Sequence, residues 1–190
     1  MPHLARLSGW RWRAILGTVC LSVLLWGGLI GVRMLFPLDY RNEILEWCST
    51  YELEPAWVAS VIRNESRFRS DAVSPAGAIG LMQIMPETGE WIAQQLQLPN
   101  FTTALLEDAS LNLAMGTWYL RHLLDRFPSR EATLMAYNAG PANAERWEGN
   151  LELAFPETQQ YVRRVRLSLP IYHAYFAVPW VVDLIPSLHF

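Results

Sequence analysis

The sequence predicts a mainly α fold: a compact helical domain with a small turn or strand segment, preceded by one N-terminal transmembrane helix. Three observations lead to this prediction. Residues 14–32 carry no charge. Apolar residues recur at helical spacing through much of 37–170. Residues 69–85 break that spacing with Ser, Pro and Gly, so we expect turns there, with a short strand pair as an alternative.

The first 36 residues are expected to hold a membrane anchor. A helix from Ala14 to Val32 would nearly span a hydrocarbon core of roughly 30 Å. Arg6, Arg11 and Arg13 precede this run and acidic residues follow it, so the positive-inside rule places the N-terminus in the cytoplasm. A cleaved signal peptide is the alternative, but the run exceeds the usual apolar stretch of about 7–15 residues. We therefore predict an uncleaved anchor.

The rest of the chain is predicted to form short helices with recognisable starts. Aspartate or serine, which cap helix N-termini, precedes three of them, and proline, which suits the first helical position, begins four. These starts are Asp39, Asp108 and Ser129, and Pro55, Pro86, Pro141 and Pro156. The expected helices cover residues 39–51, 55–65, 86–96, 109–127 and 130–138, a helix from 141, and 156–169, the last ending before Pro170.

Composition and charge exclude several classes of function. All 15 basic residues are Arg, which rules out a Walker A phosphate loop or a Schiff-base lysine. The net charge is −3, and the chain after residue 36 carries 11 Arg against 18 acidic residues, so we expect no nucleic-acid partner. The four His and two Cys show no metal-ligand spacing. We therefore expect no metal and no organic cofactor.

Glu65 lies on the apolar side of a predicted helix end. It follows Val61 by four residues and Ile62 by three, so it extends their apolar face. Burial there would raise the pKa of its carboxyl group, and an acid protonated near neutral pH can act as a general acid. The alternative is a surface glutamate at a frayed helix end beside three arginines.

A long motif begins at Glu65 and three further motifs follow it. Residues 65–88 match Glu-Ser-x-Phe, Ala-x-Ser-x-x-Gly-Ala-x-Gly-Leu-Met-Gln and Pro-x-Thr. Later blocks are Asn-x-x-x-Gly-x-x-Tyr-Leu at 112–120, Ala-Tyr-Asn-Ala-Gly at 136–140 and Glu-Thr-x-x-Tyr-Val-x-x-Val at 157–165. In this order, over about residues 44–170, they resemble the soluble lytic transglycosylase catalytic domain, a goose-lysozyme-like family of peptidoglycan-cleaving enzymes.

The resemblance implies a compact α+β, lysozyme-like fold and a defined reaction. Members of this family cleave the β-1,4 bond from N-acetylmuramic acid to N-acetylglucosamine without hydrolysis and leave a 1,6-anhydromuramoyl end. By resemblance, Glu65 is the single catalytic acid and base. The substrate's own N-acetyl group would stabilise the positive C1, which removes the need for the second carboxylate of most glycosidases.

The resemblance also implies which residues contact the sugar. They are Ser74, Met82, Gln83, Tyr137, Asn138, Glu157 and Tyr161. Ser74 and Gln83 would hold acetamido or hydroxyl groups, and Met82 would line the cleft floor or pack beneath it. Two alternatives remain open for Glu157: a cleft carboxylate, or a first-turn glutamate favoured by the helix dipole. Tyr161 would orient either Glu157 or the substrate.

Two other functions remain open beside the transglycosylase. A lysozyme-like muramidase would need a second group to activate water, and Asp71, Glu87 and Glu157 are the candidates. A non-catalytic module that binds the cell wall or acts as a scaffold is the other, and the presence of Glu65 in a complete motif disfavours it.

The predicted organisation has three parts. Residues 1–36 form a cytoplasmic N-terminus and transmembrane anchor, and residues 37–170 form the lysozyme-like transglycosylase domain. Residues 171–190 form an apolar tail that we expect to pack on the domain rather than contact the membrane surface or a protein of the cell envelope. The expected partners are peptidoglycan glycan strands and the membrane, the latter through residues 14–32, and cell-envelope proteins are a further candidate class of partner. The expected location is the bacterial cytoplasmic membrane, with the domain in the periplasm or cell-wall zone.

Overall fold

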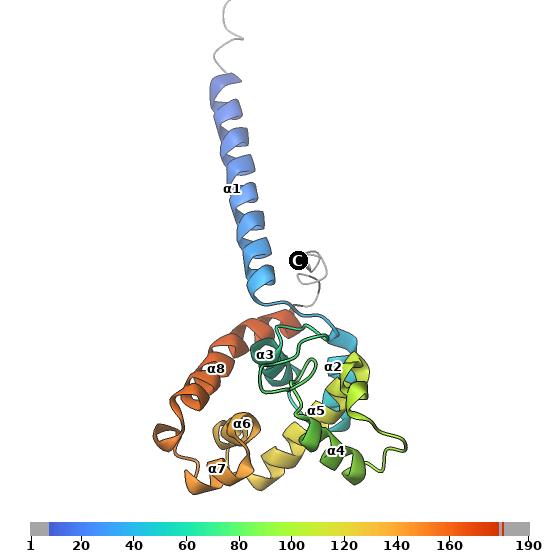
Figure 1. The fold of residues 1–190 in the computed structure, drawn as a ribbon. Coiled ribbons are helices and arrows are strands. Elements are labelled where there is room, and N and C mark those ends of the chain that lie inside the picture. The colour runs from blue at the N-terminus through green and yellow to red at the C-terminus, as the bar shows by residue number, and fades with distance from the viewer. Residues whose placement is uncertain (1–7, 179, 181–190) are drawn as a thin grey trace, which may run out of the picture.

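The computed structural model describes residues 8–178 and residue 180, and its fold is mostly helical, as predicted (Figure 1). The α-helices are α1 (Ser8–Leu35), α2 (Arg41–Thr50), α3 (Pro55–Glu65), α4 (Pro86–Gln95), α5 (Ala109–Arg126), α6 (Arg130–Ala139), α7 (Pro141–Arg146) and α8 (Pro156–Ala177). Two short 3₁₀ helices are η1 (Thr103–Glu107) and η2 (Leu151–Leu153).

Helix α1 stands apart from the rest of the molecule (Figure 1). Its segment Arg11–Leu35 has a mean hydropathy of 2.2 over its most apolar stretch, and none of that stretch is buried. A core helix of a soluble domain would bury such a surface, because exposed apolar area is unfavourable in water. Helix α1 is therefore long and apolar enough to cross a membrane, and its exposed surface suits that environment.

Helix α3 is the centre of the domain. Every residue from Ala56 to Ile62 is buried, so this part of the helix has no solvent-facing side. Helix α8 packs along it and contributes Tyr161, Val165 and Tyr172 to the same core. This packing holds both ends of α3 in place, including Glu65 at its C-terminus.

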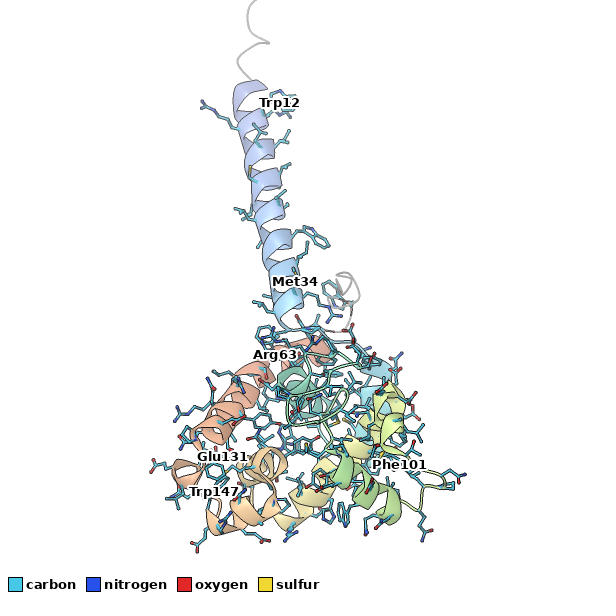
Figure 2. All side chains as sticks on the ribbon, in the orientation of Figure 1. Trp12, Met34, Arg63, Phe101, Glu131 and Trp147 are labelled. Carbon is cyan, nitrogen blue, oxygen red and sulfur yellow. The ribbon has the colours of Figure 1, made fainter. Side chains whose placement is uncertain are left out.

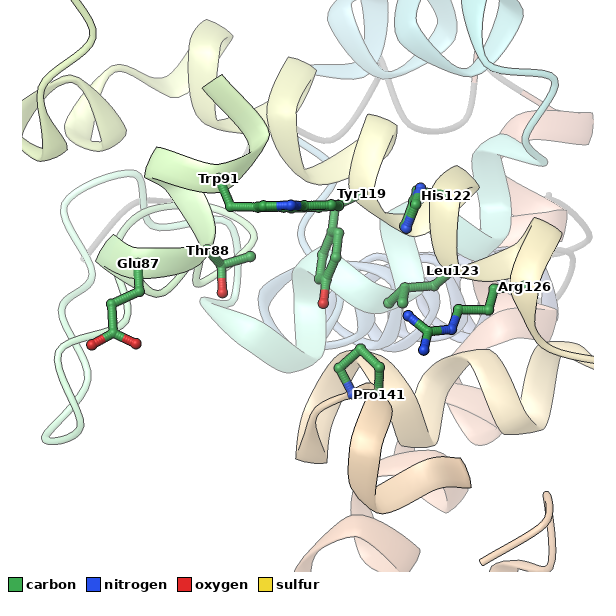
Figure 3. Close-up of a pocket in the computed structure, with 8 residues that line it drawn as sticks. All are labelled: Glu87, Thr88, Trp91, Tyr119, His122, Leu123, Arg126 and Pro141. Carbon is green, nitrogen blue, oxygen red and sulfur yellow. The ribbon is translucent and has the colours of Figure 1, made fainter. Parts of the chain in front are cut away.

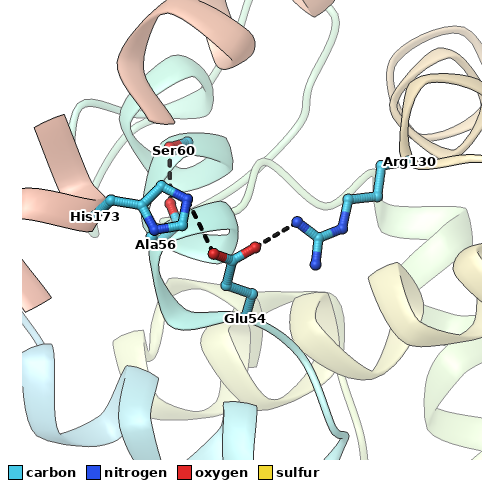
Figure 4. Close-up of polar contacts among 5 residues, drawn as sticks. All are labelled: Glu54, Ala56, Ser60, Arg130 and His173. Carbon is cyan, nitrogen blue, oxygen red and sulfur yellow. Dashed lines mark hydrogen bonds and ion pairs between the residues drawn. The ribbon is translucent and has the colours of Figure 1, made fainter. Parts of the chain in front are cut away.

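An ion-pair cluster lies at the N-terminal end of α3 (Figure 4). The carboxylate of Glu54, which precedes the helix, contacts Arg130 at the start of α6 and the Nε2 atom of His173 in α8, the latter at 3.0 Å. Such partly exposed pairs add little stability, typically about 0–1 kcal/mol. Their contribution here is to join three helices that are distant in sequence.

The segment between α3 and α4 contains turns and isolated bridges in place of a regular strand pair. Bridges join Val73 to Ile79 and Ile79 to Ile84. The buried side chain of Asn112 in α5 holds this segment in place. It accepts a hydrogen bond from the Met82 backbone N–H at 2.8 Å and donates to the Ile79 carbonyl oxygen at 2.9 Å. It also donates to the Leu106 carbonyl oxygen of η1 at 2.9 Å. One buried amide therefore satisfies three backbone groups.

The predicted helix starts are right at two caps and at all four prolines, whereas one predicted cap and one predicted helix end are wrong. Asp108 and Ser129 cap α5 and α6, accepting from the backbone N–H of the residue three positions later. The cap predicted at Asp39 is wrong, because α2 begins at Arg41 and Tyr40 occupies the N-cap position without a side-chain bond.

The predicted end of the last helix is also wrong. Helix α8 continues through Pro170 to Ala177. A proline inside a helix costs about 3 kcal/mol, but Tyr172 beyond it is fully buried, and that packing outweighs the lost hydrogen bond. The first seven residues of the predicted 171–190 tail therefore belong to α8, whereas 179 and 181–190 lie outside the described residues.

Candidate active site

Glu65 is the last residue of α3, at a point where the chain turns sharply. The next residue, Ser66, is buried; its backbone N–H closes the helix on Ile62, and its hydroxyl donates to the Leu81 carbonyl at 2.8 Å. Arg67 and Phe68 then adopt left-handed backbone angles with φ of 56° and 65°. The turn and the Ser66 bond join the end of the helix to the 66–85 segment beside it.

The environment of Glu65 favours its neutral form. The residue as a whole is partly exposed, yet burial of its carboxyl group raises the pKa of that group from 4.5 to about 7. Hydrogen bonding from Tyr161 and the positive charge of Arg164 act in the opposite direction and lower the pKa. Desolvation is the largest of the three effects, so a substantial fraction of Glu65 is protonated near neutral pH.

Two tyrosines from different helices flank Glu65. Tyr161 of α8 is only 2% exposed, and Tyr137 of α6 donates its hydroxyl to the Met82 carbonyl at 2.8 Å. Burial, followed by the negative charge of Glu65, raises the pKa of both hydroxyls, so both stay protonated.

The Tyr161 hydroxyl has no partner at full hydrogen-bond geometry in the described part of the chain. It nevertheless lies close enough to Glu65 for donation to that carboxyl to lower the pKa of the acid. We infer that this hydroxyl is available to the carboxylate when Glu65 ionises.

Tyr137, whose hydroxyl pKa is raised by burial and by the charge of Glu65, links that acid to a groove whose lining does not include Glu65 itself. The groove runs across α4, α5, α6 and α7. It consists of two cavities of about 320 and 380 Å³ that share Thr88, Tyr119 and Pro141. The smaller cavity, nearer the acid, is lined by Gln83, Ile84, Met85, Tyr137, Asn138, Ala139 and Gly140 as well as the shared residues. The larger adds Glu87, Trp91, His122, Leu123 and Arg126 (Figure 3). Tyr137 therefore borders both the groove and Glu65.

The structure places the predicted sugar-contacting residues in different surroundings. Gln83 and Asn138 line the smaller cavity together with Tyr137. The Gln83 amide also donates to the carbonyls of Ala72 and Gly80, so it holds its own loop. Ser74 accepts from the Ala78 N–H at 3.0 Å within the same loop.

Three further predictions concern Met82, Tyr161 and Glu157. The Met82 side chain is fully buried, so in this structure it packs beneath the loop. Tyr161 is next to Glu65, as described above. Glu157 lies exposed in the first turn of α8 and lines neither cavity of the groove.

Sequence reasoning missed the far half of the groove. Trp91, His122 and Arg126 line it, and Tyr119, which was not among the predicted sugar-contacting residues, lines both cavities. Tyr119, His122 and Arg126 are spaced by three and four residues along α5, which places them on one helix face. That spacing was visible in the sequence, but nothing in it showed that the face borders a cavity.

No metal-binding cluster is present among the described residues. Within residues 8–178 and 180, no three His, Cys, Asp or Glu side chains gather where they could hold an ion. The chemically distinctive group of the described site is the Glu65 carboxyl with its two tyrosines and the adjoining groove.

Comparison with known proteins gives consistent matches. Residues 42–154 match the model of the transglycosylase SLT domain. The soluble lytic murein transglycosylase of Escherichia coli K12 is 32% identical over 154 residues, which cover 74% of this chain and 24% of that protein. Membrane-bound lytic murein transglycosylase C of Actinobacillus pleuropneumoniae serotype 5b is 35% identical over 112 residues, covering 54% of this chain and 31% of that protein.

A solved structure matches the fold as well. An inactive variant of the lytic transglycosylase Slt from Pseudomonas aeruginosa superposes with a TM-score of 0.70 and 30% identity, over 77% of this chain and 26% of that one. The chain thus spans about a quarter of the length of these soluble relatives.

Proposed function

The chain belongs to the transglycosylase SLT domain family, and from this membership we propose that it is a membrane-anchored lytic transglycosylase that cleaves peptidoglycan glycan strands. The observation that carries the proposal is Glu65: the acid lies near Tyr137, which lines the groove, and burial raises the pKa of its carboxyl group to about 7. An acid with a pKa near the working pH can both give and accept a proton efficiently.

The proposed reaction uses Glu65 twice. The protonated carboxyl first gives its proton to the glycosidic oxygen as the bond from that oxygen to C1 of N-acetylmuramic acid breaks. The resulting carboxylate then takes the proton of the muramic C6 hydroxyl as that oxygen bonds to C1. The proton balance closes on Glu65 and no water is consumed, so the product carries a 1,6-anhydro ring. In the ionised step, the nearby Tyr161 hydroxyl stabilises the carboxylate.

The surroundings of Glu65 support one acid rather than a pair. The described groups that shift its pKa are Tyr161 and Arg164, and neither is a carboxylate. Asp71 and Glu157 are exposed, Glu87 lies in the farther cavity, and none of the three shifts the pKa of Glu65. A hydrolase would need a second carboxylate placed to activate water, and the described site offers none beside Glu65.

The proposal includes a location. Helix α1 suits a membrane span, and one relative is named as membrane-bound. The arginines before the span and the acidic residues after it favour a cytoplasmic N-terminus. We place the chain in the bacterial cytoplasmic membrane as a single-pass protein with its domain on the outer side. A tether of this kind raises the local concentration of the enzyme at the wall.

Mass spectrometry of digested peptidoglycan tests the activity. The full chain in detergent is compared with Glu65→Gln, which keeps the shape of the side chain but cannot supply the proton. We expect anhydromuramoyl products from the unmodified protein and none from the variant. Glu157→Gln, at an exposed carboxylate outside both cavities, serves as the matched control and should retain most activity.

The products also separate the alternatives. Reducing ends, heavier than anhydro ends by one water, would identify a muramidase, and loss of activity in Glu87→Gln would then point to the water-activating group. Binding of the protein to peptidoglycan with no products would indicate a non-catalytic module.

A further inference from the structure

The junction between α1 and the domain is closely packed rather than a loose linker. The chain leaves α1 at Leu35 and begins α2 at Arg41. Leu38, midway between them, is 3% exposed and belongs to the hydrophobic core. A flexible tether would be solvated and free of such contacts.

Hydrogen bonds tie this junction to two helices of the domain. Arg63 of α3 donates from Nε to the Leu35 carbonyl at 3.3 Å, and Tyr172 of α8 donates its hydroxyl to the Pro37 carbonyl at 2.8 Å. Arg33, at the end of α1, is 7% exposed and donates to the Leu38 carbonyl at 3.2 Å. The Leu35 carbonyl, in the last turn of α1, thus finds its partner in the domain.

Aromatic contacts surround these bonds. The guanidinium of Arg63 lies 4.8 Å from the centre of the Phe36 ring, and Phe36 packs edge-on against Tyr172. The guanidinium groups of Arg33 and Arg41 each lie 5.9 Å from a ring centre near the end of α8, that of Tyr175 and that of Phe176 respectively. The final turns of α8, beyond Pro170, are therefore part of the junction.

The same contacts reach the catalytic helix. Arg63 is two residues before Glu65 on α3, and Phe68, three residues after Glu65, packs on Tyr172. In Figure 2, Arg63 lies at the face of the domain from which α1 emerges, with Met34 on the last turns of α1. Figure 1 shows α4 and α7, which border the groove, at the opposite end of the domain from α1.

We propose that residues 33–41 and the end of α8, which we name the mount, seat the domain on the surface of the lipid bilayer in one fixed orientation. This inference rests on the proposed anchoring by α1. The bilayer meets the face of the domain that contains the mount, and the groove is held at the far end, directed toward the wall. The catalytic domain thus works at a set height above the membrane and does not swing on a tether.

Distance measurements between two spin labels test whether the mount holds the domain in one orientation relative to α1. Cys20, exposed on α1, takes one label, and Gln160→Cys, at an exposed position of α8, takes the other. The remaining Cys48 is buried and burial raises the pKa of its thiol to about 12, so it resists labelling. The full chain is reconstituted in lipid nanodiscs, and electron–electron resonance gives the distribution of distances.

A flexible insertion provides the comparison. Six Gly and Ser residues inserted between Met34 and Leu35 should broaden the distribution, since such a segment has an end-to-end distance of about 13 Å. The same insertion between Ser8 and Gly9 lies outside the measured interval and is the matched control. We expect one narrow distribution for the unmodified chain and the control. If the unmodified chain gave a distribution as broad as that of the chain with the insertion after Met34, the proposal would be wrong.

Substitutions then test the named contacts. Arg63→Met with Tyr172→Phe removes the bonds to Leu35 and Pro37 while keeping apolar bulk, and should widen the distribution. An unchanged width would contradict the role given to these two residues. Circular dichroism and activity on isolated peptidoglycan check that the domain still folds. Failure of the anchoring itself is distinguishable, because the protein would then be extracted from membranes by alkaline carbonate.

Discussion

In the proposed mechanism, the protonation state of Glu65 affects both activity and stability. Burial holds its folded-state pKa near 7, above the unfolded value of 4.5. Between these values the folded state keeps a proton that the unfolded state has lost. The free energy of unfolding therefore falls as pH rises from 4.5 to about 7. Above this range the folded protein bears the full cost of a buried, ionised carboxyl group. A stabilising acid of low pKa would show the opposite trend.

The first prediction is that Glu65→Gln stabilises the protein at alkaline pH. Glutamine resembles the neutral acid, so the variant and the parent should be equally stable near about pH 4. Above about pH 8 the variant should be more stable by about 1–2 kcal/mol, less than the full shift implies because the residue is partly exposed. Urea unfolding at both pH values measures this, with Glu157→Gln as the exposed control. Equal stability of parent and variant at alkaline pH would contradict a buried acid.

The second prediction concerns Tyr161→Phe. The hydroxyl favours the charged form of Glu65, so removing it should raise the pKa of the acid further. In a plot of the rate of anhydro-product formation against pH, the fall in rate on the alkaline side (the alkaline limb) should move to higher pH. The phenyl ring of the variant preserves the packing. Tyr137→Phe is the comparison, because that hydroxyl already donates to Met82. An unmoved alkaline limb in Tyr161→Phe would show that its hydroxyl does not reach the carboxylate.

The local sequence was enough to predict the place of Glu65 on its helix, but not the effects that set its pKa. The spacing of Glu65 from Val61 and Ile62 was enough to place it at an apolar helix end, because helix periodicity is local. The effect of the Arg164 charge on this pKa was not predictable, since α8 packs along α3 through tertiary contacts alone. The effect that dominates its pKa, desolvation, depends on the same packing.

At the scale of elements, the 66–85 segment is the part of the site that depends most on backbone conformation. Gly77 and Gly80 both adopt positive φ, at 89° and 81°. A Cβ on Gly77 would meet nothing within 4 Å, whereas one on Gly80 would lie 2.6 Å from the Leu106 carbonyl oxygen and would also collide with the Asn112 amide. Two glycines with similar backbone angles thus have different reasons to be glycine.

The third prediction uses this matched pair. Gly77→Ala should cost about 1 kcal/mol, the strain of placing an L side chain at positive φ. Gly80→Ala should cost about 3 kcal/mol or more, because the backbone of η1 and the buried Asn112 must also move. The midpoint of urea unfolding measures both. Similar losses in the two variants would show that backbone strain alone explains these glycines.

Helix boundaries were predictable where side chains cap them locally and not where packing decides. Asp108 and Ser129 bond to backbone groups three residues away, so the sequence around each is sufficient. Pro170 is a local signal to stop, but burial of Tyr172 keeps α8 helical beyond it. The free-energy cost of a proline in a helix can be read from the local sequence. The packing that compensates for it comes from α3 and from the segment between α1 and α2.

At the scale of the whole molecule, the groove and the mount are arrangements of elements that no single segment encodes. The residues predicted to lie near Glu65 all belong to the motif blocks that this family shares. The farther cavity contains Trp91 and Arg126, which lie outside those motifs. The mount joins Pro37 to Tyr172 across most of the chain. Such pairs become neighbours only after α3, α5 and α8 have packed.

The fourth prediction is that the farther cavity binds the glycan strand beyond the cleavage point. Trp91 lines it beside Tyr119 and packs against Trp118 and His122 (Figure 3). Apolar faces of sugars pack on such rings, and losing about 1 kcal/mol of contact would lower kcat/KM about fivefold. Trp91→Ala should therefore slow cleavage of long strands.

Substrate length separates this role from a structural one. A strand too short to reach from the cavity beside Glu65 into the farther one should be cleaved equally by Trp91→Ala and the unmodified protein. Trp91→Tyr keeps an aromatic face and should recover most of the activity on long strands. If Trp91→Ala slowed cleavage of short and long strands alike, the ring would act by supporting α4 against α5, and the strand would not extend past Tyr119.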